Sequence, residues 1–136
     1  MSIYIRIFAL FNLANGLMMI IAPMTWYELT PGASDSGPFN VHFVRDIGIA
    51  FTAAGAGLWL ALGNAAWKSA STAIVAMIFI GGHGILHFVE MFAHHLELNA
   101  ALRDFAMIVL PAGIAGWWAV REVQRSTRAN QREAGT

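Results

Sequence analysis

The chain has 136 residues, which is the size of one domain. Of these residues, 57% are hydrophobic and only 12% are charged, and the formal net charge is zero. This balance gives no sign of a nucleic-acid-binding surface, and the lack of cysteine excludes disulfides, thiol catalysis and cysteine-ligated zinc. A mean hydropathy of +0.58 and long windows without charge favour membrane spans.

The first apolar window covers Ile7–Ala22 and stops at Pro23, and we predict an uncleaved membrane span there. The next segment, Pro23–Asn40, contains three prolines, two glycines and an adjacent Trp-Tyr pair. This composition predicts an interfacial loop with an aromatic anchor. The second apolar window is Ile47–Gly63, and Val41–Asp46 is expected to begin the same helix.

The third window runs from about Ala70 to Met91, and the fourth covers Phe105–Val120. Pro111 lies inside the fourth window and predicts a kink. We therefore predict an all-α fold, a four-transmembrane-helix bundle in residues 1–121, followed by a polar, basic tail in residues 122–136. The segments "VRDIGIAF" and "LRDFAMIV" each open a span with Arg-Asp, which would fit two duplicated helical hairpins.

The basic residues predict the orientation of this bundle. Arg45 and Arg103 lie on one side of the predicted topology, and the remaining basic residues lie on the side of both termini: Arg6, Lys68, Arg121, Arg125, Arg128 and Arg132. By the positive-inside rule, both termini are expected in the cytoplasm of a bacterium, with the spans in its inner membrane. Trp117 and Trp118 are expected to form an aromatic belt at the cytoplasmic interface.

The segment "HGILHFVEMFAHH", residues 83–95, holds four of the five histidines and one glutamate. His83, His87, Glu90 and His94 follow one another at helical spacing and therefore share one face of the third helix. The predicted topology brings two further groups to the same outer depth. These are His42, Arg45 and Asp46 of the second helix, and Arg103 and Asp104 of the fourth.

An ionisable group inside a membrane costs about 2.5–3.5 kcal/mol, so these groups are expected to pair. The pairs that we expect are Asp46 with Arg45 or His87, and Glu90 with Arg103. A simpler interpretation makes Arg45, Asp46, Arg103 and Asp104 structural ion pairs at helix starts, and places His94 and His95 at a wet loop end. His83, His87 and Glu90 would then form a hydrogen-bond network that locks helices together.

The same side chains can also hold a cofactor. Imidazole and carboxylate groups ligate zinc, iron and copper, and the candidate metal ligands are His83, His87, Glu90, His42 and Asp46, with Asp104 nearby. Alternatively, histidines of two helices could ligate haem b, with His42, His83 and His87 as candidates. A third hypothesis is a quinone or small polar substrate, with histidine and aspartate as proton carriers.

The segments "RIFALFNLANGLMMIIAP", "WYELTPG" and "GPFNVHFVRDIGIAF" resemble a group of small four-helix bacterial membrane proteins that has no established reaction. More remotely, the chain resembles the DoxX-like superfamily. The first resemblance covers residues 1–120 and implies the four-helix fold, and the second implies a membrane redox partnership. Neither assigns a catalytic residue.

We therefore expect a small membrane protein that binds a transition metal or haem at an outward-facing site, as a redox or metal-handling component. One alternative is an accessory or structural subunit of a larger membrane complex. Another is a small transporter or a membrane enzyme for a lipophilic substrate, so enzymatic activity stays open. Besides the lipid bilayer, a second copy of the chain is a candidate partner, since small residues recur on the predicted helices.

Overall fold

A computed structural model of the protein describes residues 1–63, 66–93 and 96–134. The described residues form helices and no strand. The α-helices are α1 (Ser2–Ile21), α2 (Pro23–Leu29), α3 (Val41–Ala61), α4 (Ala66–Ala93), α5 (Leu98–Asp104) and α6 (Leu110–Ala134). A 3-10 turn lies at Ser34–Ser36, and a π-helical segment, Phe105–Val109, joins α5 to α6.

Four helices are long and apolar enough to cross a membrane: Ser2–Ile21, Val41–Ala61, Ser69–Ala93 and Leu98–Ala134. The predicted all-α fold with four spans is therefore confirmed, and these apolar helices suggest contact with a lipid bilayer. The last helix continues through the polar residues after Arg121, so the predicted tail extends the fourth span as far as Ala134.

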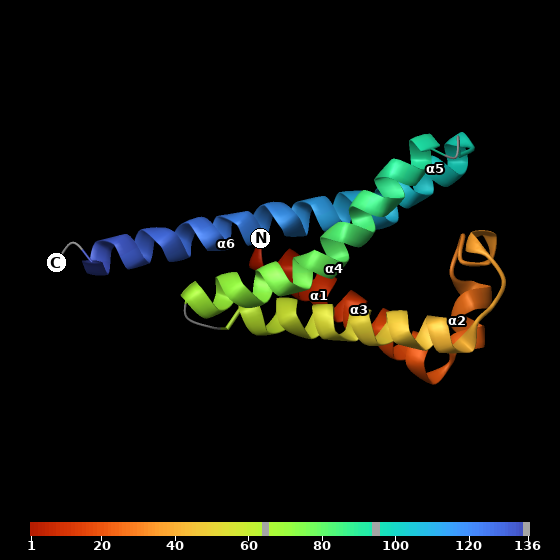
Figure 1. Ribbon diagram of the computed structural model, residues 1–136, viewed down its shortest axis with the longest axis horizontal. Helices are drawn as coiled ribbons and strands as arrows, with labels where there is room; N and C mark the ends of the chain where they lie inside the picture. Colours follow the sequence, from red (N-terminus) through yellow and green to blue (C-terminus); the bar gives the residue numbers. More distant parts are fainter. Residues whose placement is uncertain (64–65, 94–95, 135–136) are drawn as a thin grey trace.

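The spans form two hairpins. α1 packs along α3, α4 packs along α6, and α3 contacts α4 to join the two pairs. In Figure 1 the pairs lie together in the middle of the molecule and diverge toward the end that carries α2 and α5. At the opposite end, α6 projects beyond the other helices (Figure 1).

Small residues allow the helices of each hairpin to approach closely. A Cβ atom on Gly16 of α1 would lie 2.5 Å from the carbonyl oxygen of Gly48 and 2.6 Å from the backbone nitrogen of Thr52, both in α3. A Cβ atom on Gly84 of α4 would lie 2.8 Å from the Cβ of Ala112 in α6. Since lipid is as apolar as the side chains, such close packing contributes much of the attraction between membrane helices.

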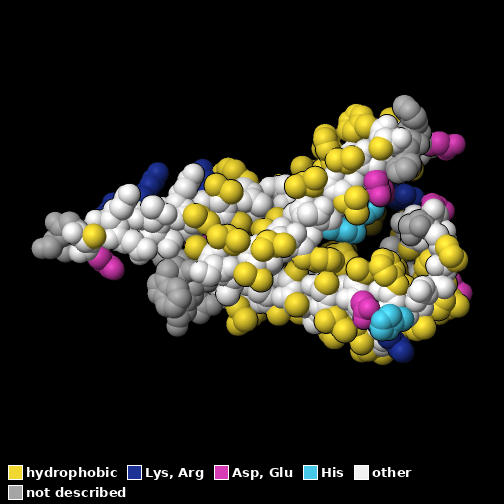
Figure 2. All heavy atoms as spheres, viewed as in Figure 1, with side chains coloured by type: hydrophobic (Ala, Val, Ile, Leu, Met, Phe, Trp, Pro, Cys, Tyr) yellow, Lys and Arg dark blue, Asp and Glu magenta, His cyan; other side chains and the backbone are white. Residues whose placement is uncertain are grey.

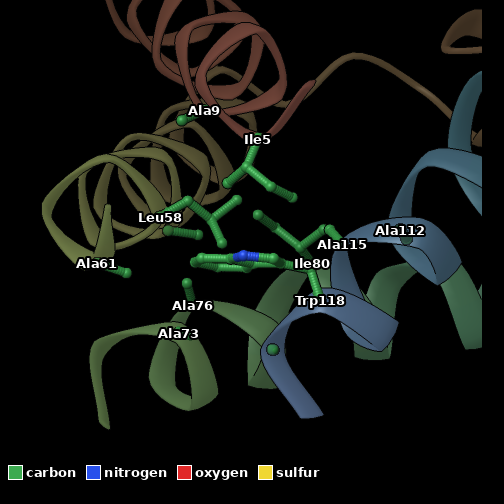
Figure 3. Packing of buried hydrophobic residues seen from close by; sticks show 12 residues of the cluster. Ile5, Ala9, Leu58, Ala61, Ala73, Ala76, Ile80, Ala112, Ala115 and Trp118 are labelled. Atoms are coloured by element: carbon green, nitrogen blue, oxygen red, sulfur yellow. The ribbon is translucent and has the colours of Figure 1, made fainter. Parts of the chain in front are cut away.

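The core lies where the two hairpins meet. Figure 3 shows the Trp118 ring of α6 among Leu58, Ala76 and other small or branched side chains. Trp118 is only 6% exposed, whereas its neighbour Trp117 is 48% exposed. The expected aromatic belt is therefore corrected to one interfacial candidate, because consecutive helical residues point about 100° apart and Trp118 turns inward.

The segment after α1 is more ordered than the predicted loop. Pro23 starts the short helix α2, where its missing N–H costs nothing. The Trp26 indole nitrogen donates to the side-chain oxygen of Asn15 at 2.8 Å, and the Tyr27 hydroxyl donates to the carbonyl oxygen of Gly37 at 2.6 Å. These bonds hold α2 and the chain up to Gly37 against the end of the first hairpin at which α1 ends and α3 begins.

Pro111 cannot make the regular backbone hydrogen bond of an α-helix in the fourth span. It has no N–H, so it cannot donate to the carbonyl oxygen of Met107. Just before it, the backbone widens to the π-helical segment, in which the Leu110 N–H donates to the carbonyl oxygen of Phe105. The structure thus has a π-helical turn just before Pro111, a feature that is frequent at functional sites, and the kink expected at Pro111 stays a prediction.

Candidate functional site

The candidate site begins with stacked rings on α4. His83 and His87 lie one turn apart, with ring centroids 4.7 Å apart and ring planes at 75°. Phe79, one turn before His83, stacks on it at 6.1 Å, and Phe51 of α3 meets the His83 ring edge-on at 5.3 Å. These contacts fix the His83 ring between two helices.

Asp104 at the end of α5 holds the second histidine. The His87 Nδ1 atom lies 3.2 Å from the Asp104 Oδ2 atom. Because an ionised carboxylate can only accept, Nδ1–H is the donor of this hydrogen bond. On its other oxygen, Asp104 accepts from the Arg103 Nε atom at 2.9 Å. The Asp104 side chain is only 11% exposed, so both hydrogen bonds offset the cost of taking its charge out of water.

Local structure explains why Asp104 reaches α4. Gly84 lies three residues before His87 on the same face of α4 and brings α6 close through its contact with Ala112. The π-helical segment between Asp104 and Ala112 inserts a wider turn that rotates α5 relative to α6. The close approach and the wide turn together place the carboxylate beside His87.

The segment after α2 also reaches this site. Gly32 adopts a positive φ of 87°, and a Cβ atom there would lie 2.5 Å from the Nη2 atom of Arg103. The Arg103 guanidinium therefore rests on the backbone of Gly32 while its Nε binds Asp104. Figure 2 shows a hollow between the two diverging hairpins, with histidine, acidic and basic side chains along its α4–α5 wall.

The structure does not bring His42 and Asp46 to this cluster. The two side chains pair with each other at 3.2 Å on the surface of α3, where His42 is 86% exposed and Asp46 is 55% exposed. His42 precedes Phe51 by nine residues, or about two and a half turns at 3.6 residues per turn. Since Phe51 faces His83, His42 points the opposite way, and Figure 2 shows histidine in two separate places.

The expected ion pairs are corrected in the same way. Asp46 pairs with His42, and neither Arg45 nor His87 is its partner. Arg45 instead donates through Nε to the carbonyl oxygen of Ile20, at the end of α1, at 3.1 Å. Arg103 pairs with the neighbouring Asp104, and the expected pair with Glu90 does not form.

Among the described residues, no three histidine, aspartate or glutamate side chains converge closely enough to hold a metal ion. Glu90 is half-buried on α4, three residues beyond His87. His94 and His95 lie outside the described residues, so the interpretation of these two as a wet loop end stays a prediction.

Sequence reasoning missed the two phenylalanines and undervalued Asp104. Phe79 precedes His83 by four residues, so helical spacing alone could have placed Phe79 on the same face of the helix as His83 and His87. Phe51 has no such signal, because its position depends on how α3 packs against α4. Asp104 was expected chiefly as a structural partner of Arg103, and that ion pair is present.

The arrangement has a clear chemical capacity. When the Nδ1–H of His87 is held by a carboxylate, its Nε2 atom is left with a free lone pair in a fixed direction. This carboxylate–histidine pattern is the usual support for a histidine that ligates a metal. The same pattern also suits a proton acceptor, so the arrangement fits either a metal or a protonatable ligand.

Comparison of the chain with family models, with curated proteins and with solved structures finds no match.

Proposed function

We propose that this membrane protein binds a transition metal ion through His83 and His87 and acts as a redox or metal-handling component. The observation that carries the proposal is the hydrogen bond from His87 Nδ1 to Asp104 Oδ2, 3.2 Å long. It supplies the outer carboxylate that typically orients a ligating imidazole and raises its basicity. His83, one turn away, supplies a second imidazole.

The small number of protein ligands favours a site that exchanges its metal ion over a site at which the ion is purely structural. Structural zinc sites have four protein ligands, whereas the described part of this chain offers the ion two neighbouring imidazoles. The remaining coordination positions would be filled by water, by a substrate or by another molecule's ligands. An ion held this way can be passed on or can bind a reactant, and nitrogen ligands suit copper, iron and zinc.

Haem b fits these residues less well than a metal ion does. Two axial ligands must approach a haem iron from opposite faces, and His83 and His87 lie on the same face of one helix. His42, the expected partner from α3, points away from them. A haem would therefore take one axial histidine here, or both from two copies of the chain.

We assign the protein to the inner membrane of a bacterium, with both termini in the cytoplasm, because basic residues are concentrated on that side of the topology. The hollow between the hairpins would then open toward the outside. The resemblance to DoxX-like proteins stays a prediction, and a redox role is consistent with it.

The test is metal analysis and visible spectroscopy of the protein purified in detergent. We expect bound metal in the wild type, at the same content in His42→Ala and at a lower content in His87→Ala and in His83→Ala. His42→Ala is the matched control because it removes an exposed imidazole that pairs with Asp46 and lies outside the His83–His87 cluster.

Other outcomes would replace the proposal. A protein that is metal-free and also fails to bind added Cu²⁺ contradicts it. A Soret band that vanishes in His87→Ala would establish haem instead of an ion. A stable co-purifying complex, unchanged in His83→Ala and His87→Ala, would establish an accessory subunit in which the cluster joins helices.

A further inference from the structure

The last span carries a second feature, formed by side chains that do not belong to the histidine cluster. An apolar groove of about 610 Å³ runs along the outer face of α6 and its π-helical segment, lined chiefly by Met1, Phe105, Leu110, Gly113 and Trp117. Gly113 forms part of its floor, and a Cβ atom there would meet nothing within 4 Å. The groove therefore exists partly because residue 113 has no side chain.

A positive charge lies at the end of this groove. Arg121 follows Trp117 by one helical turn, and its guanidinium carbon lies 4.0 Å from the centroid of the Trp117 ring. The side chain therefore points back along the helix, and the charge is held at the depth of the indole and not one turn farther out. Arg121 has no carboxylate partner in the part of the chain that the structure describes.

Arg125 continues the same face one turn beyond Arg121. Its Nη1 atom donates to the Glu122 side chain at 2.9 Å, and the arginine side chain is 71% exposed. Figure 2 shows basic side chains along one edge of the projecting part of α6, next to hydrophobic side chains farther along that edge. The surface thus changes from apolar to basic within one or two turns.

The length of the groove matches one lipid chain. Phe105 and Trp117 are twelve residues apart, which corresponds to about 18 Å of helix at ~1.5 Å per residue. One leaflet of the hydrocarbon core is about 15 Å thick, half of ~30 Å. Charge and length together point to a molecule with an acyl chain and an anionic head.

We propose that this groove binds an anionic phospholipid of the leaflet on the side of the C-terminus. Its acyl chain lies over Gly113 between Phe105 and Trp117, and its phosphate pairs with Arg121 and the remaining donors of Arg125. A guanidinium fits a phosphate well because it offers two parallel N–H groups. The inference does not depend on the metal site, since it uses no residue of the histidine cluster.

The experiment measures lipid selectivity of the reconstituted protein by electron paramagnetic resonance. Protein in phosphatidylcholine vesicles is probed with spin-labelled phosphatidylglycerol and, separately, with spin-labelled phosphatidylcholine. We expect phosphatidylglycerol to associate more strongly, by about fivefold for each basic side chain that acts on it. The preference should fall by about fivefold in Arg121→Gln, because the charge of Arg125 is still present.

Two further variants distinguish lipid binding in the groove from a general electrostatic attraction of anionic lipid to the basic helix. Gly113→Leu fills the groove and keeps every charge, so it should also lower the preference. Arg132→Gln removes a charge of the same helix about 16 Å beyond Arg121 at ~1.5 Å per residue, so it should leave the preference unchanged. Circular dichroism and size-exclusion profiles matching the wild type are required of each variant.

The proposal is overturned if the wild type shows no preference for phosphatidylglycerol. It is equally overturned if Arg132→Gln lowers the preference as much as Arg121→Gln, or if Gly113→Leu has no effect. Either of these last results would mean that diffuse positive charge attracts the lipid without a groove.

Discussion

His87 of α4 and Asp104 of α5 are joined by a hydrogen bond of 3.2 Å between Nδ1 and Oδ2, across the second hairpin. The bond connects the last residue of α5 to the row of stacked rings on α4, which contains Phe79, His83 and His87. It also fixes the orientation of the His87 ring, on which the proposed function depends.

Replacing Asp104 tests this bond directly. In Asp104→Asn the carboxylate that holds the His87 Nδ1–H is lost. We expect the affinity for Cu²⁺ to fall by about 10–100-fold, which is typical when a carboxylate that hydrogen-bonds a metal-ligating histidine is replaced. Isothermal titration with Cu²⁺ measures the change. Glu90→Gln is the matched control, because it neutralises a carboxylate of α4, three residues beyond His87, that does not bind this histidine. Its affinity should stay at the wild-type value.

His42→Ala separates the two histidine groups. Because its side chain is exposed and bonded to Asp46, we expect unchanged Cu²⁺ affinity and a stability within about 0.5 kcal/mol of the wild type. An affinity loss equal to that of His87→Ala would mean that α3 is rotated so that His42 faces the site.

Two glycines of α4 test the close packing of the second hairpin. In Gly84→Ala the new methyl group would lie 2.8 Å from the Cβ of Ala112, so the helices must separate, at a cost of about 1–3 kcal/mol. In Gly82→Ala the methyl group meets nothing within 4 Å, and no loss is expected. Unfolding in detergent by titration with a denaturing surfactant compares the two. Equal midpoints for both variants would refute the close approach at Gly84.

The loop glycines test whether the segment after α2 supports the site. Gly32→Ala and Gly37→Ala both place a side chain at positive φ, 87° and 139°, and each should cost about 1–3 kcal/mol of stability. Only Gly32→Ala also displaces the Arg103 guanidinium, whereas a Cβ atom at Gly37 meets nothing within 4 Å. We therefore expect weaker Cu²⁺ binding in Gly32→Ala alone, and equal binding by the two variants would argue against this contact.

The spans could be predicted from sequence because they depend on composition and length, which a window of residues contains. The arrangement of polar groups depends instead on how each helix is rotated about its axis. On α3, Gly48 faces α1 because only a residue without a side chain fits there, and this contact turns Asp46 about 160° away at ~100° per residue. Equal predicted depth in the membrane was expected to bring these groups together, but depth does not fix the face of the helix on which a side chain lies.

The bond between Asp104 and His87 shows the other limit of sequence reasoning. The Arg-Asp pair and the stripe of histidines were both visible, and the helical spacing of His83 and His87 predicted their neighbouring rings. Their connection required the π-helical turn at Phe105–Val109, which changes the rotation of Asp104 relative to the rest of the span. Sequence periodicity describes only a helix of regular pitch. Such a helix would place the Asp104 carboxylate on a different face of the fourth span.

The most direct test of the account is pulsed electron paramagnetic resonance of Cu²⁺ bound to the protein, which detects and counts the coordinated imidazoles. Copper is the probe because it binds nitrogen sites most tightly among the divalent first-row ions. We predict that the wild type and His42→Ala coordinate Cu²⁺ through both His83 and His87, and that His83→Ala retains only the imidazole of His87. Bound Cu²⁺ without imidazole coordination, or an imidazole count unchanged in His83→Ala and in His87→Ala, would contradict the account.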